Sequence, residues 1–295
     1  SLDYDPITMD LFLAKVICDP NFDPDGLVVA EARGEVVGFC LAIVRKLPLK
    51  GVDLDSDTGW ITVMGVVPEW RRKGVGTALV RAAEAYIKSR GRKAALVSPY
   101  APNYFWPGVD EGAYPAAVRL LESLGYRRLY SPIAMDRNLV DFTVPDDVRE
   151  VEKQREAEGY RFGRLDPSRV HELIVFADER FNPDWGRAVR EAIAARVPKD
   201  RMFIAVNPRG RIAGFALFGC YGGAEDRFGP FGVDDAERGK GLGKILLYRT
   251  LEAMKAEGLH GAWFLWTSEE SAAGLLYKRA GFSITRRFQV MRKEL

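Results

Sequence analysis

Short apolar runs and helical stripes alternate along the chain, and their order occurs twice. Apolar residues spaced three to four apart predict helices, and short apolar runs between turn residues predict strands. The first copy is predicted to contain a helix, a β-hairpin, a strand, a second helix and a further strand, at 8–18, 27–44, 60–67, 78–91 and 94–97. The second copy repeats this plan at 168–196 (interrupted near Asn182-Pro183), 202–218, 228–233, 246–258 and 262–266. Such alternation predicts an α/β or α+β architecture.

Each copy carries the sequence Arg-x-x-Gly-x-Gly between its third strand and the following helix. The first motif begins at Arg71 and the second at Arg238, and the same separation of 167 positions relates Gly91 to Gly258. Glycine is the usual residue just past the end of a helix, so the two predicted helices match at both ends. A motif repeated in the same context indicates two copies of one local structure.

The composition of these two loops suits the binding of an anion. Glycines let a ligand approach the backbone closely, and the first N–H groups of the following helix have no partners within the helix. The helix dipole favours negative charge there, and the planar fork of arginine matches phosphate oxygens. A diphosphate is therefore the expected ligand, and the alternative is a basic turn that binds nothing. Neither loop has the glycine pattern of dinucleotide-binding or P-loop proteins.

The order of residues in the loops resembles the CoA-pyrophosphate loop of the GNAT acetyltransferase superfamily, Gln/Arg-x-x-Gly-x-Gly/Ala. Copy one also has the hydrophobic-Val-Pro approach of many members, at Val66-Val67-Pro68. The resemblance covers nearly the whole chain as two tandem domains. It implies an α/β (α+β) fold with a mixed, mostly antiparallel sheet flanked by helices, whose central strands splay apart around acyl-CoA. It also implies an N-acetyltransferase that moves an acetyl group from acetyl-CoA to a primary amine of a small molecule or peptide.

The resemblance assigns acetyl-CoA to both loops. The cofactor-binding residues predicted in copy one are Val66, Val67, Arg71, Arg72, Lys73, Gly74, Val75, Gly76 and Thr77. Those predicted in copy two are Val233, Arg238, Gly239, Lys240, Gly241, Leu242, Gly243 and Lys244.

The resemblance further assigns a proton donor to copy two. In the family a tyrosine four residues before a Gly-Phe or Gly-Tyr pair protonates the departing thiolate, and Tyr277 stands in that place before Gly281-Phe282. Copy one has Leu121 there, which cannot donate a proton, so copy two is predicted to be the catalytic one. Copy one is then silent or uses another donor, such as Tyr114. The alternative for Tyr277 is a packed aromatic side chain on a helix.

The general base is not evident from the sequence. Many relatives place a glutamate on the strand before the loop, but the strand 228–233 has no carboxylate. Glu225 and Asp226 lie just upstream and are the candidates for this base, acting directly or through water in contact with the substrate. A solvated turn is their alternative interpretation.

Copy one contains an insertion of about eleven residues. Gly125 matches Gly281, and Met135 matches Met291, with a shorter offset of 156, so the extra residues fall within 98–115. This segment is rich in aromatic residues and proline. We expect it either to form the wall of a pocket or to pack against the second copy. The predicted substrate contacts here are Tyr104, Trp106, Asp110 and Tyr114.

The repeat predicts three parts: an N-terminal GNAT-like domain at 1–139, a linker helix at 140–159 and a C-terminal GNAT domain at 160–295. The linker is highly charged, with a helix start near Thr143 and a stop at Gly159. Two such units in one chain are expected to act as a monomer (a pseudo-dimer) or as a homodimer.

Composition narrows the class of protein. A chain of 295 residues, 47% hydrophobic, has room for two globular domains, and a net charge of +2 gives no broad nucleic-acid footprint. No apolar run has membrane-spanning length and no signal peptide is evident, which predicts a cytoplasmic protein. Three cysteines without metal-like spacing are predicted to be reduced core thiols, and two histidines make a metal site unexpected.

Two other functions remain open. A non-catalytic acyl-CoA-binding or regulatory protein with degenerate GNAT domains fits the missing carboxylate and Leu121. An aminoacyl or peptidyl transferase using charged tRNA fits less well, because such relatives usually lack both loops.

Overall fold

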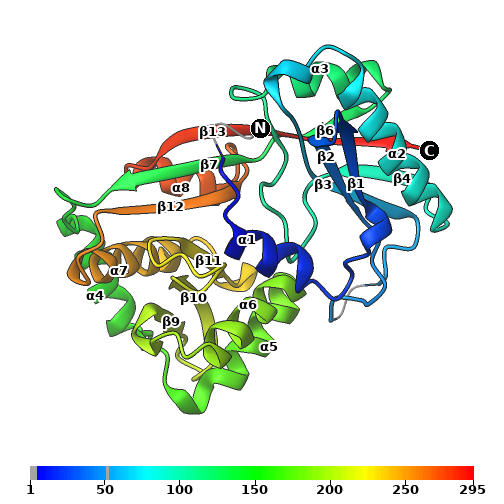
Figure 1. Cartoon of the computed structure of the whole chain (residues 1–295). Coiled ribbons are helices and arrows are strands. Elements are labelled where there is room, and N and C mark those ends of the chain that lie inside the picture. The colour runs from blue at the N-terminus through cyan, green and yellow to red at the C-terminus, as the bar shows by residue number, and fades with distance from the viewer. Residues whose placement is uncertain (1–4, 51–52) are drawn as a thin grey trace. The chain divides into compact units, whose positions relative to one another are not determined.

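The structure, a computed structural model, describes residues 5–50 and 53–295, which form two compact units (Figure 1). Unit 1 comprises the described residues up to Ile133 together with Arg286–Leu295, and unit 2 comprises Ala134–Thr285. The two units therefore differ from the two sequence copies in which last strand belongs to each. The strand that ends copy two completes unit 1, and the residues after Ile133 that end copy one belong to unit 2.

Unit 1 is built around a mixed, mostly antiparallel sheet. Its strands follow the order β1 (Leu27–Ala32), β2 (Glu35–Ile43), β3 (Thr58–Val66), β4 (Ala94–Val97) and the last part of β13 (Ser283–Glu294). The β3–β4 pair is parallel and the other neighbours are antiparallel. Two short strands, β5 (Val109–Asp110) and β6 (Arg127–Tyr130), also pair with β13.

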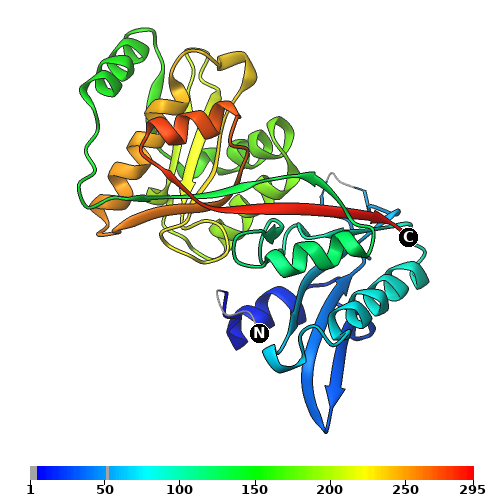
Figure 2. The ribbon, with the colours of Figure 1, turned by 90° about the horizontal axis from the view of Figure 1, so that it is seen from above.

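Helices cover this sheet and close its core. The helical segments of unit 1 are α1 (Met9–Phe12), the π-helix η1 (Leu13–Ile17), the 3-10 turns η2 (Pro24–Gly26) and η3 (Pro68–Trp70), α2 (Val75–Ser89) and α3 (Pro115–Ser123). Figure 2 shows the blue β1–β2 hairpin with α2 beside it. The apolar face of α2, including Leu79, Ala83 and Ile87, is buried against Ala42 and Ile61. This burial fixes the start of α2 at the end of β3, where the first loop lies.

Unit 2 has a four-stranded antiparallel sheet in the order β11 (Phe228–Val233), β10 (Ile212–Phe218), β9 (Met202–Val206) and β8 (Arg161–Arg164). β7 (Ile133–Asn138) and β12 (Gly261–Thr267) are neighbours, and one parallel bridge joins Arg227 to Trp263. The helices are α4 (Asp146–Ala157), α5 (Val170–Arg180), α6 (Pro183–Ala194), α7 (Leu242–Ala256) and α8 (Ala272–Arg279). The 3-10 turns are η4 (Pro167–Arg169), η5 (Lys199–Arg201) and η6 (Asp235–Glu237).

Local sequence accounts for most of the observed boundaries. Arg33 and Gly34 both have positive φ and form the hairpin turn between β1 and β2. The interruption predicted near Asn182-Pro183 in the helical stretch 168–196 is confirmed: the Asn182 side chain caps α6, and Pro183 occupies its first turn. One expectation was wrong: Cys40 and Cys220 are buried free thiols, but Cys18 is exposed, because it caps the end of η1 at the surface.

Among residues 5–50 and 53–295, no helix combines the length and apolar character needed to cross a membrane. The same residues hold no cluster of three or more histidine, cysteine, aspartate or glutamate side chains suited to a metal ion.

Candidate functional site

The two Arg-x-x-Gly-x-Gly loops have the same backbone conformation. Arg72 and its counterpart Gly239 have φ of +59° and +79°. Gly74 and Gly241 have φ of +84° and +80°, and each caps the following helix without a side-chain hydrogen bond. Positive φ at the cap turns the chain sharply from the loop into the helix, which leaves the first helical N–H groups facing outwards.

The surroundings of the last glycine also match. A Cβ atom placed on Gly76 or on Gly243 meets a corresponding set of three side chains. Around Gly76 they are Leu120, Met64 and Val66, and around Gly243 they are Leu276, Phe231 and Val233. These pairs are separated by the offsets of 167 and 156 found in the sequence repeat, so the two loops occupy equivalent places in their units.

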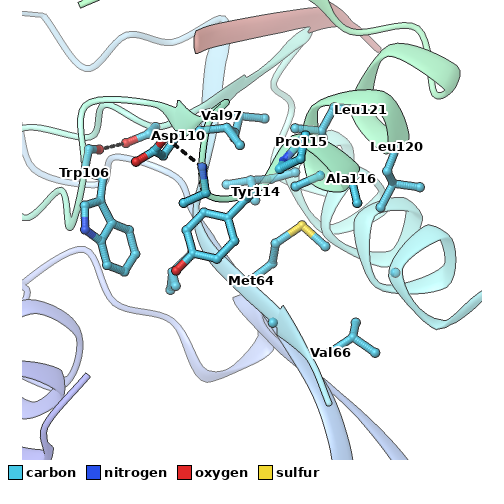
Figure 3. Close-up of a pocket in the computed structure, with 18 of the residues that line it drawn as sticks. Met64, Val66, Val97, Trp106, Asp110, Tyr114, Pro115, Ala116, Leu120 and Leu121 are labelled. Carbon is cyan, nitrogen blue, oxygen red and sulfur yellow. Dashed lines mark hydrogen bonds between the residues drawn. The ribbon is translucent and has the colours of Figure 1, made fainter. Parts of the chain in front are cut away.

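The first loop opens onto a cavity of about 570 Å³ in unit 1 (Figure 3). Six of the residues predicted to bind the cofactor line it: Val66, Arg71, Arg72, Gly74, Gly76 and Thr77. Val67, Lys73 and Val75 lie in the same loop but are not among the lining residues. A Cβ atom on Gly74 would meet no heavy atom within 4 Å, so the helix mouth is open at this point.

The cavity lies where β3 and β4 separate. The two strands pair from Thr58 to Ile61, and Ser98 N donates the last hydrogen bond, to Ile61 O at 2.9 Å. Beyond this point β3 continues to Val66 while β4 ends at Val97. The register of β2 and β3 also shifts here, between Leu41 and Ala42. The separated strands expose the edge of β3, and residues 61–66 line the cavity in an unbroken run.

The predicted insertion forms the far wall of the cavity. Trp106, Asp110 and Tyr114 all line it, whereas Tyr104 is buried elsewhere and its carbonyl accepts a hydrogen bond from Lys15 Nζ at 2.5 Å. Figure 3 places Trp106 and Tyr114 on one side, and Leu120 and Leu121 of α3 on the other.

Arg286 connects this wall to the last strand of the chain. Its Nε donates to Asp110 Oδ2 at 2.5 Å, and its two terminal nitrogens donate to the two oxygens of Asp5 at 2.6 and 2.8 Å. Tyr114 Oη and Trp106 Nε1 each donate to Asp5 at 3.0 Å. Burial alone lowers the pKa of Arg286, but the hydrogen bonds with Asp5 and Asp110 raise it overall. The side chains at this end of the cavity are thus held in one connected arrangement.

The sequence gives no local signal for Asp5 or Arg286. Neither belongs to a motif, and they lie 281 positions apart. The register of β5 with β13 brings Arg286 close to Asp110, because Asp110 pairs with Phe288, two residues after Arg286, and the Arg286 side chain in turn binds Asp5. Alternate residues of a strand face the same side, so Arg286 and Phe288 share the face on which the Arg286 guanidinium lies 5.0 Å from the Phe288 ring centroid.

The second loop is covered by α4. A Cβ atom on Gly241 would lie 2.8 Å from Val151 Cγ1 of this helix. Lys244 Nζ is 2.5 Å from Asp147 Oδ2, also on α4. Within the loop region, Lys240 Nζ contacts Glu237 at 2.6 Å and Tyr160 Oη at 2.8 Å, and Arg238 pairs with Asp235 at 2.6 Å. The cationic side chains predicted to bind a diphosphate therefore have protein partners.

Aromatic side chains fill the strand separation of unit 2. β11 and β12 also part beyond the bridge between Arg227 and Trp263, and rings from both strands, from α8 and from the turn after α8 pack there. The members of this aromatic cluster are Phe228, Phe231, Phe264, Tyr277 and Phe282, with ring centroids 4.4 to 6.4 Å apart. Their counterparts in unit 1 are Ile61, Met64, Val97, Leu121 and Tyr126, and the first four of these line the cavity.

Tyr277 is a member of this cluster and is 6% exposed. Burial strongly raises the pKa of its hydroxyl. Its position matches the packed-aromatic alternative. The carboxylate of Glu225 lies 3.1 Å from Arg201 Nη2, and the backbone carbonyl of Asp226 accepts a hydrogen bond from Trp263 N at 3.2 Å.

Unit 2 has a different cavity of about 780 Å³, bounded by α5, the β9–β10 turn and η6. Its lining includes Arg180, Asp234 and Glu237 but none of residues 238–244. It therefore lies beside the second loop without including the predicted cofactor-binding glycines.

The chain belongs to the GNAT acetyltransferase family, with two GNAT domains in tandem. Residues 4–126 match the Acetyltransferase (GNAT) family, and residues 198–284 match the Acetyltransferase (GNAT) domain. The fold and family predicted from the sequence, including acetyltransferase character, are confirmed.

Several proteins are similar to this chain. A mycothiol acetyltransferase from Saccharomonospora viridis is 26% identical over 285 residues, which is 89% of this chain and 86% of that protein. A fungal GCN5-related glucosamine N-acetyltransferase region has a TM-score of 0.77 and 21% identity, covering 97% of this chain and 34% of that chain. A tandem GNAT protein from the clavulanic acid biosynthesis pathway has a TM-score of 0.60 and 18% identity, covering 92% and 85%. At these identities the two solved structures show a shared fold.

Proposed function

We propose that the protein transfers an acetyl group from acetyl-CoA to a primary amine, and that unit 1 carries this reaction. The observation that carries the proposal is the cavity of about 570 Å³ that begins at the first loop and ends at Asp110 and Arg286. One end offers arginine side chains and an open helix mouth, and the middle is apolar. This combination suits a ligand with a diphosphate at one end and an uncharged arm.

The residues of the first loop fit the diphosphate of acetyl-CoA. Gly74 leaves open the space that a side chain would fill, next to the first N–H groups of α2, which have no partners within the helix. Arg71 and Arg72 supply positive charge at the same end of the cavity. When bound, acetyl-CoA supplies the activated acetyl group. The exposed edge of β3 would then offer backbone N–H groups to the carbonyl of the acetyl group. Such hydrogen-bond donors stabilise the negative charge that develops on the carbonyl oxygen during the reaction.

This proposal places catalysis in unit 1, whereas the sequence favoured copy two because of Tyr277. The physical reasons for the change are the α4 residue Val151 over Gly241 and the aromatic cluster in the strand separation. The Tyr277 ring packs among phenylalanine rings, and Tyr277 lines neither of the two cavities described above. We therefore propose that unit 2 is a degenerate GNAT domain that does not bind acetyl-CoA. The regulatory alternative assumed that both domains are degenerate, and the covered second loop supports this for unit 2 only.

The acceptor is proposed to be a small molecule. The relative from Saccharomonospora viridis is named for mycothiol and the fungal region for glucosamine, and both of these are small molecules. The cavity is of the size that small-molecule sites have, which favours a compact amine over a folded peptide.

Calorimetric titration with acetyl-CoA, followed by mass spectrometry of reactions with a panel of small primary amines, tests this function. We expect one acetyl-CoA bound per chain, and an increase of one acetyl mass on at least one amine. Binding of two acetyl-CoA molecules per chain would contradict the proposal that α4 keeps the second loop closed to the ligand. Binding without acetylation of any amine would favour the regulatory alternative, and no binding at millimolar acetyl-CoA would contradict both.

A further inference from the structure

We propose that the cavity of about 780 Å³ in unit 2 binds a small organic anion, a carboxylate or phosphate monoester with an apolar body. The anionic group is held at one end of the cavity by Arg209, Arg211 and His171. This site goes beyond the proposed function, because its lining includes neither the cavity of unit 1 nor the glycines of either loop. It gives a binding role to the domain whose cofactor loop is covered.

Hydrogen bonds attach the turn between β9 and β10 to the start of α5. Arg169 Nη2 donates to Gly210 O at 2.6 Å, and Ile212 N donates to Glu172 Oε1 at 2.9 Å. Arg169 and Glu172 lie on either side of His171 in the sequence. The turn is therefore held beside His171, and the two together form one end of the cavity.

Asn207 attaches the same turn to η6. Its Nδ2 donates to Glu237 Oε1 at 3.1 Å, and its Oδ1 accepts hydrogen bonds from the backbone N–H groups of Arg209 and Arg211, each at 3.1 Å. One side chain therefore fixes the backbone that carries both arginines. Because this backbone is held before a ligand arrives, less conformational entropy is lost on binding.

Three side chains at this end of the cavity carry N–H donors: Arg209, Arg211 and His171. In the described part of the chain, these three side chains take part in no hydrogen bond or ion pair. A guanidinium presents its N–H groups in a planar fork that matches a carboxylate or a phosphate, and an imidazole adds a further donor. The turn end of the cavity therefore offers positive charge and N–H donors to a ligand.

Among the described residues, four carboxylates line the cavity, and three of them pair with cations of the protein. These pairs are Glu172 with Arg169 at 2.7 Å, Asp234 with Arg180 at 3.4 Å, and Glu237 with Lys240 at 2.6 Å. The fourth carboxylate, Glu179, follows His171 on α5 by about two helical turns, which is about 12 Å along the axis. The carboxylates therefore do not cancel the positive charge at the turn end.

Apolar side chains line the cavity beside this end: Val175 and Phe176 of α5, and Ile212 and Ala213 of β10. Val175 lies one helical turn after His171, so these two side chains are neighbours on one face of α5. An anionic group next to His171 therefore places the rest of the ligand over apolar side chains. An apolar lining with a few charged groups, in a cavity of this volume, is typical of small-molecule sites.

The test compares acids with amides of equal size: benzoate with benzamide, and indole-3-acetate with indole-3-acetamide. Calorimetric titrations of the full chain, with and without saturating CoA, give the dissociation constants. We expect the acid of at least one pair to bind about tenfold or more tightly than its amide, because charge-assisted hydrogen bonds are the stronger ones. Phenyl phosphate, titrated beside benzoate, shows whether a phosphate monoester or a carboxylate is preferred. Equal binding within both pairs, together with no binding of phenyl phosphate, would overturn the site.

Arginine substitutions locate the preference. The double variant Arg209→Gln and Arg211→Gln removes two positive charges and is expected to lose most of the preference for acids. Both residues are exposed, so the fold should be retained, and thermal denaturation checks this. Arg279→Gln is the matched control, because Arg279 is an exposed arginine of α8 that does not line the cavity. A preference for acids that survives the double variant contradicts the assignment.

Val175→Glu tests the position of the anionic group. This variant places a carboxylate one helical turn from His171, at a residue that is only partly buried, so the fold should tolerate it. We expect repulsion to weaken acid binding about tenfold while amide binding changes little. Unchanged acid binding would place the anionic group elsewhere and overturn the proposal.

The titrations with CoA separate this site from the first loop, whose arginines also attract anions. We expect the preference for acids to persist in saturating CoA, and loss of all acid binding there would overturn the assignment to unit 2. A preference for acids in a protein that does not bind CoA would contradict the proposed function and leave the unit 2 site intact. CoA binding and amine acetylation without any preference for acids would contradict the unit 2 site alone.

Discussion

The first loop opens onto a cavity, and the second, with the same backbone turn, is covered by a helix. Gly74 and Gly241 differ by only 4° in φ, yet one faces open space and the other faces Val151. The loop conformation is therefore a property of the motif, whereas access to it is decided by residues elsewhere in the chain. The repeated motif predicts the conformation of the loop, and the segments packed around the loop determine whether a ligand can reach it.

The strand separations differ in the same way. Corresponding positions carry aliphatic side chains in unit 1 and aromatic ones in unit 2: Ile61 and Phe228, Met64 and Phe231, Val97 and Phe264, Leu121 and Tyr277. Aromatic rings bury large areas and pack with one another, so they stabilise unit 2 while filling the space that unit 1 leaves open. The positions that line a cavity in unit 1 thus form part of the hydrophobic core in unit 2.

Transfer of the aromatic cluster into unit 1 is the strongest test of this comparison. The double variant Met64→Phe and Val97→Phe places phenylalanines where unit 2 has Phe231 and Phe264. Both positions line the cavity, so the rings are expected to occupy ligand space and weaken acetyl-CoA binding about 100-fold, equal to about 2.8 kcal/mol. Calorimetry measures the affinity, and an unchanged dissociation constant would remove the cavity from the proposed function.

The reciprocal exchange in unit 2 is the matched control. Phe231→Met and Phe264→Val take aromatic rings out of a packed cluster and are expected to lower the free energy of unfolding by several kcal/mol. Acetyl-CoA affinity should stay the same, because α4 still covers the second loop. Weaker acetyl-CoA binding in this variant, with unit 1 still folded, would show that unit 2 contributes to the ligand site.

A pair of glycine substitutions compares the two loops directly. Gly74→Ala adds a methyl group at the open mouth and strains a residue with φ of +84°, and we expect about tenfold weaker acetyl-CoA binding. Gly241→Ala has the same backbone strain, at φ of +80°, and in addition directs its methyl group at Val151, 2.8 Å away. Overpacking should therefore lower its stability by about 1–3 kcal/mol more than Gly74→Ala does and leave the affinity unchanged. Thermal denaturation and calorimetry separate the two effects, and the opposite pattern would assign the ligand to unit 2.

Much of the fold was accessible from the sequence because its signals are local. The hairpin turn at Arg33-Gly34, the helix ends at Gly91 and Gly258, the strand 94–97 and the hairpin 202–218 depend on nearby residues. The insertion was also located, because the offset of the repeat changes across it. Whether it forms a wall depends on Gly108 meeting the backbone of β13, which no local pattern encodes.

The open and closed states of the loops could not be predicted, because they depend on contacts between distant segments. Val151 meets Gly241 only after α4 packs beside α7, and Arg286 meets Asp5 only after the last strand joins unit 1. The sequence did contain a usable sign, since aromatic residues replace aliphatic ones at Phe228, Phe231 and Phe264. That substitution is interpretable once the strands are known to separate at these positions.

The smallest expected effect comes from Tyr277→Phe, which decides between the two units as the place of catalysis. Turnover is expected to be unchanged, because the Tyr277 ring packs within the aromatic cluster and burial raises the pKa of its hydroxyl. The folded protein therefore holds this proton more tightly than the unfolded chain, whose tyrosine has an ordinary pKa near 10. Its contribution to stability is complete below about pH 10 and is lost as the pH rises further, because the unfolded chain ionises first. Denaturation at pH 9 and pH 11 should show a smaller alkaline loss of stability in Tyr277→Phe than in the original protein. A fall in turnover of tenfold or more at pH 8, with stability retained, would return the proton donor to unit 2 and require α4 to move away from the second loop.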